Sequence, residues 1–373
     1  MLDLSEIEKP TLILDVSRAR RNLARMAAKA RQQGVRFRPH FKTHQSAEIG
    51  DWYRDEGIEA ITVSSVDMAV YFAQAGWDDI LIAFTANLRQ VGAIDKLAGK
   101  IHLELLVESA EAAAFLQQRL THPVDVWIKV DVGNHRTGIP VEDHVRILDL
   151  ARQIGGCSQL HFRGLLTHAG QTYHTDSTAQ ILEIYRQVVA AMGAARRALV
   201  EGGFPQAELS YGDTPSCTLA ESFQGLSEIR PGNFIFYDVM MHQLQVCPEE
   251  DIAVAVACPV VAKHAAVGAE GTEYRLVLYG GAVHLSKESI MVGGRDVYGG
   301  LAHLNRTGWG PLLPGASVYS LSQEHGLARV SADQFESFQV GDLLAVLPVH
   351  SCLTVNLYPE YVPLEGKRIG IKR

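Results

Sequence analysis

The stretch that decides the fold reads Arg36-Phe37-Arg38-Pro39-His40-Phe41-Lys42-Thr43-His44. It lies where an apolar pattern over Val35–Phe41 predicts a strand and where a helix pattern starts at Gln45. Lys42 therefore stands at the C-terminal end of a predicted strand, which is where (β/α) barrels carry their reacting groups. A solvated loop lysine is the plain alternative.

The residues around Lys42 favour a chemical role for its amine. A lysine that is desolvated and close to other cations can have its pKa lowered enough to form a Schiff base. The nearby cationic side chains are Arg38, His40 and His44. Pyridoxal phosphate, whose aldehyde forms such an imine, is therefore the first cofactor to consider, and Lys42 is a candidate catalytic and cofactor-binding residue.

Length and composition limit the class of protein. A chain of 373 residues is long for one core, so two domains are expected. The net charge of −8, with a pI near 6.0, argues against a nucleic-acid partner. The acidic start lacks the pattern of a signal peptide, and no apolar run approaches the ~18 to 20 residues that a bilayer requires. Five scattered cysteines fit reduced thiols. We expect a cytoplasmic protein with a small-molecule substrate and no membrane contact.

Short apolar runs alternate with amphipathic stretches over the first two thirds of the chain. Eight strands with helices between them predict an α/β fold built on a parallel (β/α)8 barrel, with a doubly wound open sheet as the rival. Ser17 is expected to cap the first helix. The expected strands are Val35–Phe41, Glu59–Val63, Asp79–Phe84, His102–Val107, Val124–Val130, Phe162–Thr167, Ala207–Tyr211 and Phe234–Tyr237.

The pattern changes after about Val246, where β-rich runs are separated by Gly and Pro turns and helical periodicity nearly disappears. This predicts a second, mostly β domain. We place the barrel at residues 17–245 and the β domain at residues 1–16 and 246–373. The strands expected in the β domain are Ile252–Val261, Tyr274–Tyr279, Ser317–Ser320, Leu327–Val330, Leu343–Leu347 and Thr354–Leu357.

Two turns near the late strands are suited to a phosphate. Gly232 lies in Glu228–Phe234, just before the eighth expected strand, and allows a backbone amide to approach a ligand closely. Thr214 follows the seventh strand, where it can cap a helix and donate its hydroxyl to an anion. No glycine-rich nucleotide loop of either common type is present, so a dinucleotide cofactor is not expected.

Three further residues follow the fifth and sixth expected strands. His168 can stack on a pyridine ring, and Tyr173 can bond to that ring or to a phosphate. Arg136 can bond to the phenolic oxygen of the cofactor or to a substrate carboxylate. The plain alternatives are a rim-loop histidine for His168 and a surface arginine paired with Asp131 for Arg136.

A second signal is Pro348-Val349-His350-Ser351-Cys352, which follows an apolar strand. In extended backbone, residues i and i+2 point to the same side, so His350 and Cys352 can share one metal ion. Zinc suits a nitrogen and a sulfur ligand. Because only two ligands are local, the site would be open, as a catalytic metal requires.

Taken together, these motifs resemble the D-serine dehydratase and D-threonine aldolase family, within the alanine racemase-like (fold type III) pyridoxal phosphate enzymes. The matching stretches span nearly the whole chain: residues 39–44, 167–170 with Tyr173, 212–215, 230–233, 236–238, 323–326 and 350–352. One stretch departs from the family pattern, because residues 279–287 replace an Asp-Ala-Gly sequence found in many relatives, which leaves the exact substrate open.

The resemblance implies a specific set of site residues and ligands. It implies pyridoxal phosphate on Lys42, with Arg136, His168, Tyr173, Thr214, Gly232 and Asn233 around the cofactor. It implies a divalent metal, Zn²⁺ or another such as Mn²⁺, on His350 and Cys352. Members of this fold are usually homodimers with active sites near the interface, and the substrates are D-3-hydroxy amino acids.

The favoured reaction is elimination of water from a D-3-hydroxy amino acid, with Lys42 as general base and the metal as Lewis acid on the β-oxygen. The product then yields a keto acid and ammonia. The alternatives are retro-aldol cleavage to glycine and an aldehyde, with His174 as a candidate base, and racemisation. Racemisation requires a second base opposite Lys42, for which no tyrosine stands out, and Tyr279 stays open for this role. A non-catalytic pyridoxal phosphate carrier belongs to a different class, and it would need neither a β domain nor a metal pair.

Overall fold

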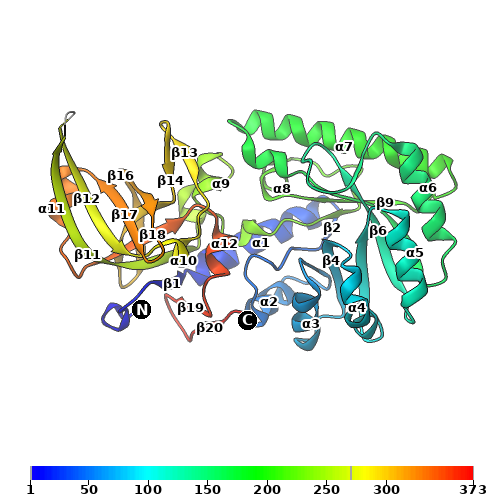
Figure 1. The fold of residues 1–373 in the computed structure, drawn as a ribbon, viewed down its shortest axis with the longest axis horizontal. Coiled ribbons are helices and arrows are strands. Elements are labelled where there is room, and N and C mark those ends of the chain that lie inside the picture. Colours follow the sequence, from blue (N-terminus) through cyan, green and yellow to red (C-terminus); the bar gives the residue numbers. More distant parts are fainter. Residues whose placement is uncertain (1, 269–270, 373) are drawn as a thin grey trace. The chain divides into compact units, whose positions relative to one another are not determined.

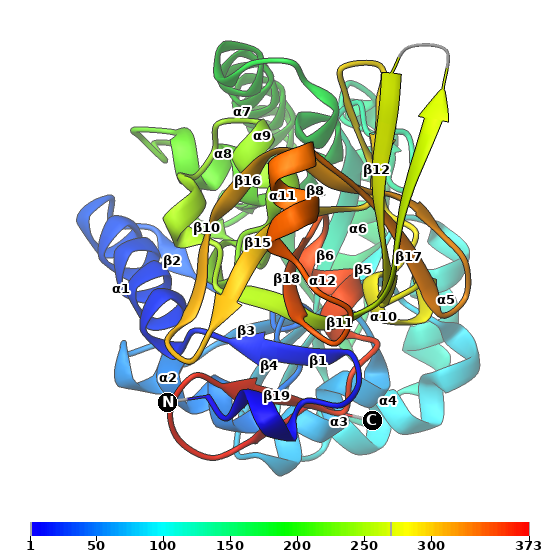
Figure 2. The same ribbon diagram turned by 90° about the vertical axis from the view of Figure 1, so that its left-hand side faces the viewer.

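The computed structural model describes residues 2–268 and 271–372. The chain divides into two compact units (Figures 1 and 2). The β unit comprises Met1–Leu23, Thr43–Ile49 and Asn233–Arg373, and the barrel unit comprises Ala24–Lys42 and Gly50–Gly232. Compactness alone does not define a folding domain, so the boundaries expected at residues 17 and 245 stay a prediction. Within the described ranges, no helix is long and apolar enough to cross a membrane.

The barrel unit contains a parallel sheet that closes on itself. Among the described residues its strand order is β2-β10-β9-β8-β6-β5-β4-β3. A parallel bridge between His40 and Thr62 joins the ends of this order, so the strands form the predicted (β/α)8 barrel. The strands are β2 (Arg36–Phe37), β3 (Ile61–Val63), β4 (Asp79–Thr85), β5 (His102–Val107), β6 (Val124–Asp131), β8 (Leu160–His168), β9 (Glu208–Gly212) and β10 (Glu228–Ile229), and β7 (Ile139–Pro140) pairs with β6.

Helices alternate with these strands and surround the sheet in Figure 1. Their starts follow the usual capping chemistry: the side chains of Ser65, Ser109 and Ser177 each accept a hydrogen bond from a backbone N–H of the first turn. The first helix begins one residue earlier than Ser17, and Asp15 bonds to the N–H of Arg18, so the expected Ser17 cap is wrong. The helices are α1 (Val16–Gln32), α2 (Ala47–Asp55), α3 (Val66–Gln74), α4 (Val91–Ala98), α5 (Ala110–Arg119), α6 (His144–Gly155), α7 (Thr178–Glu201) and α8 (Thr214–Leu219).

The expected eighth strand was misplaced. Phe234–Tyr237 does not pair with the sheet, since Asn233–Ile235 forms a short 3-10 helix, η4. The eighth strand is β10, in which Glu228 pairs with Arg36 of β2 and Ser210 of β9. This strand has only two residues and one of them is a buried glutamate, so it carries no apolar signal. As a result, Gly232 follows the eighth strand, at the end of the barrel where phosphates are usually bound.

The β unit is built around a ring of six antiparallel strands in the order β12-β17-β16-β15-β18-β11, which β11 closes by also pairing with β12. From β11 the sheet continues through β1 to β19 and β20, and Figure 2 shows β1 beside β19. The strands are β1 (Thr11–Leu14), β11 (Val254–Gly268), β12 (Gly271–Tyr279), β15 (Gly299–Asn305), β16 (Gly308–Leu321), β17 (His325–Val330), β18 (Leu343–Pro348), β19 (Glu360–Pro363) and β20 (Ile369–Gly370), with a separate hairpin of β13 (Ile290–Val292) and β14 (Arg295–Val297).

Short helices complete the β unit: α9 (Val239–Gln243), α10 (Ala282–Leu285), α11 (Ala332–Ser337) and α12 (Ser351–Val355). The strand expected at Thr354–Leu357 is therefore wrong, because its first two residues end α12 and the rest follow it. The β-branched residues Thr354 and Val355 are buried on this helix, and the Thr354 hydroxyl donates to the carbonyl of Leu285 at 3.0 Å. Burial against a neighbour has overridden the local β preference.

Candidate active site

Lys42 follows the bridge that closes the barrel, and its backbone N–H donates to Nδ1 of His40 at 3.3 Å. Its side chain is exposed at the C-terminal end of β2. The cationic surroundings that we expected are wrong in two respects. Burial lowers the pKa of His44 to about 3, which makes this imidazole neutral. The charge of Arg38 is balanced by the carboxylates of Asp79, Glu104 and Glu228.

Other cations do converge at this end of the barrel, around His168 at the end of β8. Burial lowers the pKa of His168 well below its usual range, and the charges of Lys42, Arg136 and Arg230 act in the same direction. The neutral ring donates from Nδ1 to the carbonyl of Gly212 at 2.7 Å. The structure thus brings the predicted residues Lys42, Arg136 and His168 to one place, which carries a positive potential suited to an anionic ligand.

Tyr173 and Thr214 belong to the same place. The rings of Tyr173 and His168 have centroids 6.1 Å apart, and the Tyr173 hydroxyl accepts a hydrogen bond from the N–H of Thr214 at 3.1 Å. Asp213, rather than Thr214, caps α8. The Thr214 hydroxyl is buried and has no hydrogen-bond partner among the described residues. An unpaired buried hydroxyl is costly unless a ligand completes it, so this group fits a phosphate oxygen.

Sequence reasoning gave no role to Lys129 and Arg230, although both lie at strand ends near His168. Burial lowers the pKa of Lys129 to about 8, with Arg230 and Arg136 adding to the effect, and its amine donates to the carbonyl of Val130 at 2.7 Å. Burial lowers the pKa of Arg230 to about 10. Its guanidinium donates to Ser210 Oγ at 2.7 Å and to the carbonyl of Thr167. The position of Lys129 at the end of β6 is a signal of the same kind as that of Lys42.

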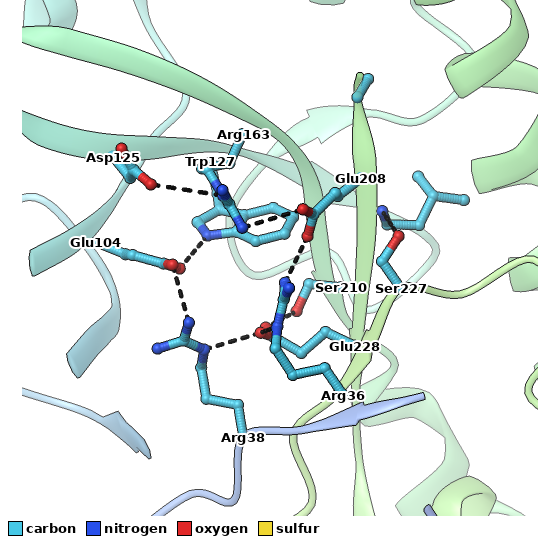
Figure 3. Close-up of polar contacts among 12 residues, drawn as sticks. Arg36, Arg38, Glu104, Asp125, Trp127, Arg163, Glu208, Ser210, Ser227 and Glu228 are labelled. Atoms are coloured by element: carbon cyan, nitrogen blue, oxygen red, sulfur yellow. Dashed lines mark hydrogen bonds and ion pairs between the residues drawn. The ribbon is translucent and has the colours of Figure 1, made fainter. Parts of the chain in front are cut away.

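A buried polar network continues from Ser210 through the inside of the barrel (Figure 3). Ser210 Oγ donates to Glu228 at 2.6 Å, and Glu228 accepts from Arg38 Nε at 2.8 Å. Arg38 also donates to Glu104 at 2.9 Å, and Glu104 accepts from the indole of Trp127 at 2.5 Å. Because these charges are paired and hydrogen-bonded, the interior can hold them without water.

One end of this network groups Asp79, His102 and Glu104 with ligand atoms within 4.8 Å of one another. Arg38 is bonded to both carboxylates. Hydrogen bonds to Asp125 and Asp79 raise the pKa of His102 to about 10. Both ring nitrogens contact these carboxylates, Nε2 with Asp125 at 3.0 Å and Nδ1 with Asp79 at 3.1 Å, so both are already occupied by ion pairs. The group is best explained as an ion-pair cluster at the N-terminal ends of β4 and β5.

The predicted metal pair lies in the β unit. His350 has extended backbone, but Cys352 is in the first turn of α12, so the expected extended backbone over both residues is wrong. The two side chains nevertheless interact. Burial lowers the pKa of His350, but Cys352 and Asp238 outweigh it and raise the pKa to about 10. The Cys352 sulfur lies 3.1 Å from the hydroxyl of Thr43. A half-buried imidazole and a buried thiol side by side match the nitrogen and sulfur ligands that zinc prefers.

The remaining predicted residues are placed differently. The Asn233 amide donates to Asp238 at 2.6 Å and its oxygen lies 3.4 Å from the Ser351 hydroxyl, so this side chain belongs with the metal pair. Gly232 is buried in the loop after β10, next to Pro231, whose carbonyl accepts from the N–H of His40 at 3.0 Å. His174 is exposed at the end of the 3-10 helix η3 (Gly170–His174) and has no polar contact with the other predicted residues within the described part of the chain.

Comparisons with known proteins identify the family of this chain. Residues 14–239 match the family model described as "Alanine racemase, N-terminal domain", and residues 253–364 match "Putative serine dehydratase domain". The chain is 32% identical to D-threo-3-hydroxyaspartate dehydratase of Delftia sp. (strain HT23), over 97% of this chain and 95% of that protein. It is 26% identical to D-serine dehydratase of Dictyostelium discoideum, over 96% and 94% of the two chains.

Several solved structures are similar to this chain over nearly its whole length. The structure of D-threo-3-hydroxyaspartate dehydratase from Delftia sp. HT23 matches with a TM-score of 0.88 and 29% identity, covering 98% of this chain and 97% of that one. A cysteine-to-alanine mutant of that enzyme in the metal-free form matches with a TM-score of 0.89 and 28% identity, over 99% of both chains. D-threonine aldolase from Filomicrobium marinum, at 21% identity and a TM-score of 0.84 with 98% of this chain and 95% of that one covered, shares the fold.

Proposed function

Since the chain belongs to the family that joins an alanine racemase N-terminal domain to a serine dehydratase domain, we propose that it is a pyridoxal phosphate- and divalent metal-dependent lyase. It eliminates water from a D-3-hydroxy amino acid, and hydrolysis of the released enamine yields a keto acid and ammonia. The observation that carries the proposal is the convergence of Lys42, Arg136 and Arg230 on the neutral His168 at the barrel end. The dehydratase relatives named above support the reaction type.

The cofactor part of the proposal assigns pyridoxal phosphate to Lys42. When bound, this group supplies an electron sink that makes the Cα hydrogen of an amino acid acidic. The Nζ of Lys42 would hold the cofactor and would take the proton from the substrate Cα. The unpaired Thr214 hydroxyl and the Tyr173 hydroxyl beside it bind the phosphate, together with backbone amides at Gly232 and Asn233.

Two further residues orient the cofactor in this proposal. His168 cannot act as an acid near neutral pH because its pKa is far below the usual range, so it serves as an uncharged face for the pyridine ring. Arg136, exposed at the rim, binds the phenolic oxygen or the substrate carboxylate.

The metal part of the proposal assigns the ion to His350 and Cys352. Zn²⁺ fits this donor pair, and Mn²⁺ is the alternative. Bound there, the ion supplies Lewis acidity toward a substrate oxygen. Retro-aldol cleavage stays the second candidate because D-threonine aldolase of Arthrobacter sp. is 25% identical over 95% of this chain. It would use His174 as a base.

A product assay tests the reaction. Purified protein is given D-serine, D-threonine or D-threo-3-hydroxyaspartate, with and without a chelator, and keto acid, ammonia, glycine and aldehyde are measured. We expect keto acid and ammonia in equal amounts, with loss of turnover in chelator and recovery on adding Zn²⁺ or Mn²⁺. Glycine plus aldehyde as the only products would replace the dehydratase assignment with the aldolase one. Conversion to the enantiomer alone would indicate a racemase.

A spectroscopic test addresses the cofactor. Lys42→Ala should lose the absorbance near ~420 nm that a lysine-bound pyridoxal phosphate gives. Lys100→Ala, which removes an exposed lysine of the barrel unit, is the matched control and should keep this absorbance. An unchanged spectrum in Lys42→Ala would mean that another lysine holds the cofactor.

We also propose a cytoplasmic location and a homodimer, which light scattering on the purified protein and cell fractionation test. Both follow from the sequence and from the general behaviour of the fold type.

A further inference from the structure

Asp238 is a fully buried carboxylate next to the metal pair, and its two oxygens have different partners. Oδ1 accepts from the N–H of Met241 at 3.0 Å and so caps α9. Oδ2 accepts from the Asn233 amide at 2.6 Å and from the N–H of Ser351 at 3.0 Å, and it lies 3.4 Å from Nδ1 of His350. Capping α9 therefore uses only one oxygen, and the other faces His350.

The backbone conformation just before Asp238 indicates that the surrounding structure fixes the position of this residue. Tyr237 has a φ of +46°, in the left-handed region that residues other than glycine rarely adopt. Such strain persists only where the surrounding structure determines the conformation, and it is common at functional sites. Here the strained residue directs the chain from η4 into α9 and places Asp238 between Asn233 and His350.

The second ligand of the pair has a partner as well. The hydroxyl of Thr43 lies 3.1 Å from Sγ of Cys352, and both side chains are buried. When Cys352 is a thiolate, this hydroxyl is the donor. Each predicted ligand thus has one polar side chain beside it that does not belong to the ligand pair itself.

We propose that Asp238 is a positioning residue for the metal centre. In this structure Nδ1 of His350 is buried, lies 3.4 Å from Oδ2 and has no hydrogen-bond partner among the described residues. In the metal-bound protein Oδ2 accepts the Nδ1–H, which fixes the tautomer of the ring and leaves Nε2 as the nitrogen that binds the cation. The inference rests on the proposed function only in taking His350 and Cys352 as metal ligands. It adds a role for a carboxylate that the sequence reasoning left unassigned.

The variant Asp238→Asn separates this role from helix capping. An asparagine keeps an oxygen at the Oδ1 position, so the cap on Met241 is retained. It replaces Oδ2 by an amide NH2, which cannot accept from Nδ1–H of His350, from the Asn233 amide or from the Ser351 N–H. Thermal unfolding of the metal-free variant therefore measures the cost of the last two bonds separately from metal binding. Asp251→Asn is the matched control, because Asp251 is also a buried carboxylate of the β unit and is not part of the metal pair.

The experiment titrates Co²⁺ into metal-free wild type, Asp238→Asn and Asp251→Asn. The readouts are the thiolate-to-metal charge-transfer band and the visible ligand-field bands, and thermal unfolding of each metal-free protein checks its folding. We expect Asp238→Asn to bind Co²⁺ about 10- to 100-fold more weakly than wild type with altered ligand-field bands, while Asp251→Asn binds like wild type. Equal affinity and equal spectra in all three proteins would overturn the positioning role and leave the metal pair intact. Absence of the charge-transfer band in wild type would instead overturn the metal assignment itself.

A measurement on the wild type keeps the proposal testable if Asp238→Asn does not fold. In the Zn²⁺-loaded protein, ¹⁵N NMR of the histidine rings should show His350 protonated at Nδ1 and metal-bound at Nε2. A His350 ring that is metal-bound at Nδ1 and protonated at Nε2 would contradict the role of Asp238.

Discussion

The Nε of Arg38 donates to Oε2 of Glu228 at 2.8 Å, and both side chains are almost fully buried inside the barrel. The same guanidinium neutralises Glu104, which is also buried. The buried charges of Arg38, Glu104 and Glu228 therefore stabilise one another. Removing one of them leaves a buried charge without a partner, which lowers the free energy of unfolding.

Replacing Arg38 should therefore destabilise the barrel strongly. In Arg38→Met, Glu228 keeps Arg36 as a partner but Glu104 loses its arginine. We expect the free energy of unfolding at pH 7 to fall by about 3–5 kcal/mol, measured by urea denaturation. The control is Arg89→Met, which removes an exposed arginine and should change it by less than about 0.5 kcal/mol. Equal stability of the two variants would show that the buried network is not needed.

His102 should make stability depend on pH above neutrality. Its pKa is raised to about 10 by hydrogen bonds to Asp125 and Asp79, against about 6.5 in an unfolded chain. The stabilisation is therefore complete below pH 6.5 and is lost as pH rises toward 10. His102→Gln should flatten the fall in stability between pH 7 and 9, whereas His264→Gln, in an exposed strand position, should not. An NMR titration that places the pKa of His102 near 6.5 would refute this.

Lys129 should destabilise the folded state near neutral pH. Its folded pKa of about 8 lies below the unfolded value of about 10.4, so the cost is complete below pH 8 and decreases as pH rises toward 10. Lys129→Met should raise the free energy of unfolding at pH 7 by at most about 3 kcal/mol, with a smaller gain at pH 10. A constant difference between variant and wild type from pH 7 to 10 would contradict this explanation.

Thr214 should contribute to cofactor affinity without contributing to the stability of the cofactor-free protein. Thr214→Val removes a hydroxyl that has no partner among the described residues, so the stability of the free protein should stay equal or rise. The dissociation constant of pyridoxal phosphate should rise about 10- to 100-fold, as expected for a lost bond to a charged group. The control Thr62→Val should lower the stability of the free protein and leave cofactor affinity unchanged, because the Thr62 hydroxyl donates to the carbonyl of Arg38 at 2.9 Å. Fluorescence titration and thermal unfolding of both variants measure the two effects.

Much of the barrel could be predicted because its strands are apolar and its helices carry ordinary caps. The strand expected over Val35–Phe41 is shorter in the structure, where β2 is Arg36–Phe37 and Lys42 lies two residues after the bridge at His40. The eighth strand could not be found, since β10 has two residues and its Glu228 is buried only because Arg36 and Arg38 meet it. The pattern of apolar residues in a sequence carries no information about ion pairs between buried side chains.

The surroundings of the candidate site were less predictable than its residues. From the sequence alone, His44 counts as a cation near Lys42, but burial makes its imidazole neutral in the folded protein. Burial is a property of the fold that the local sequence does not report. Likewise, Asp238 and Ser351 are 113 residues apart in the chain, so no local pattern could connect that carboxylate with the metal pair. The roles assigned to Lys42, Arg136, His168, Tyr173, His174, Thr214, Gly232, Asn233, His350 and Cys352 stay predictions. The experiments above test those of Lys42 and Thr214 and that of the metal pair.

The pairing of strand β1 affects when the β unit can fold during protein synthesis. Leu12 pairs with Val256, and Ile13 pairs with both Ala255 and Val362. A growing polypeptide thus exposes this apolar strand at the ribosome long before either neighbour has been translated. Contacts of such large sequence separation slow folding and leave edges open to wrong pairing, so maturation of the β unit is expected to be post-translational and sensitive to chaperone supply.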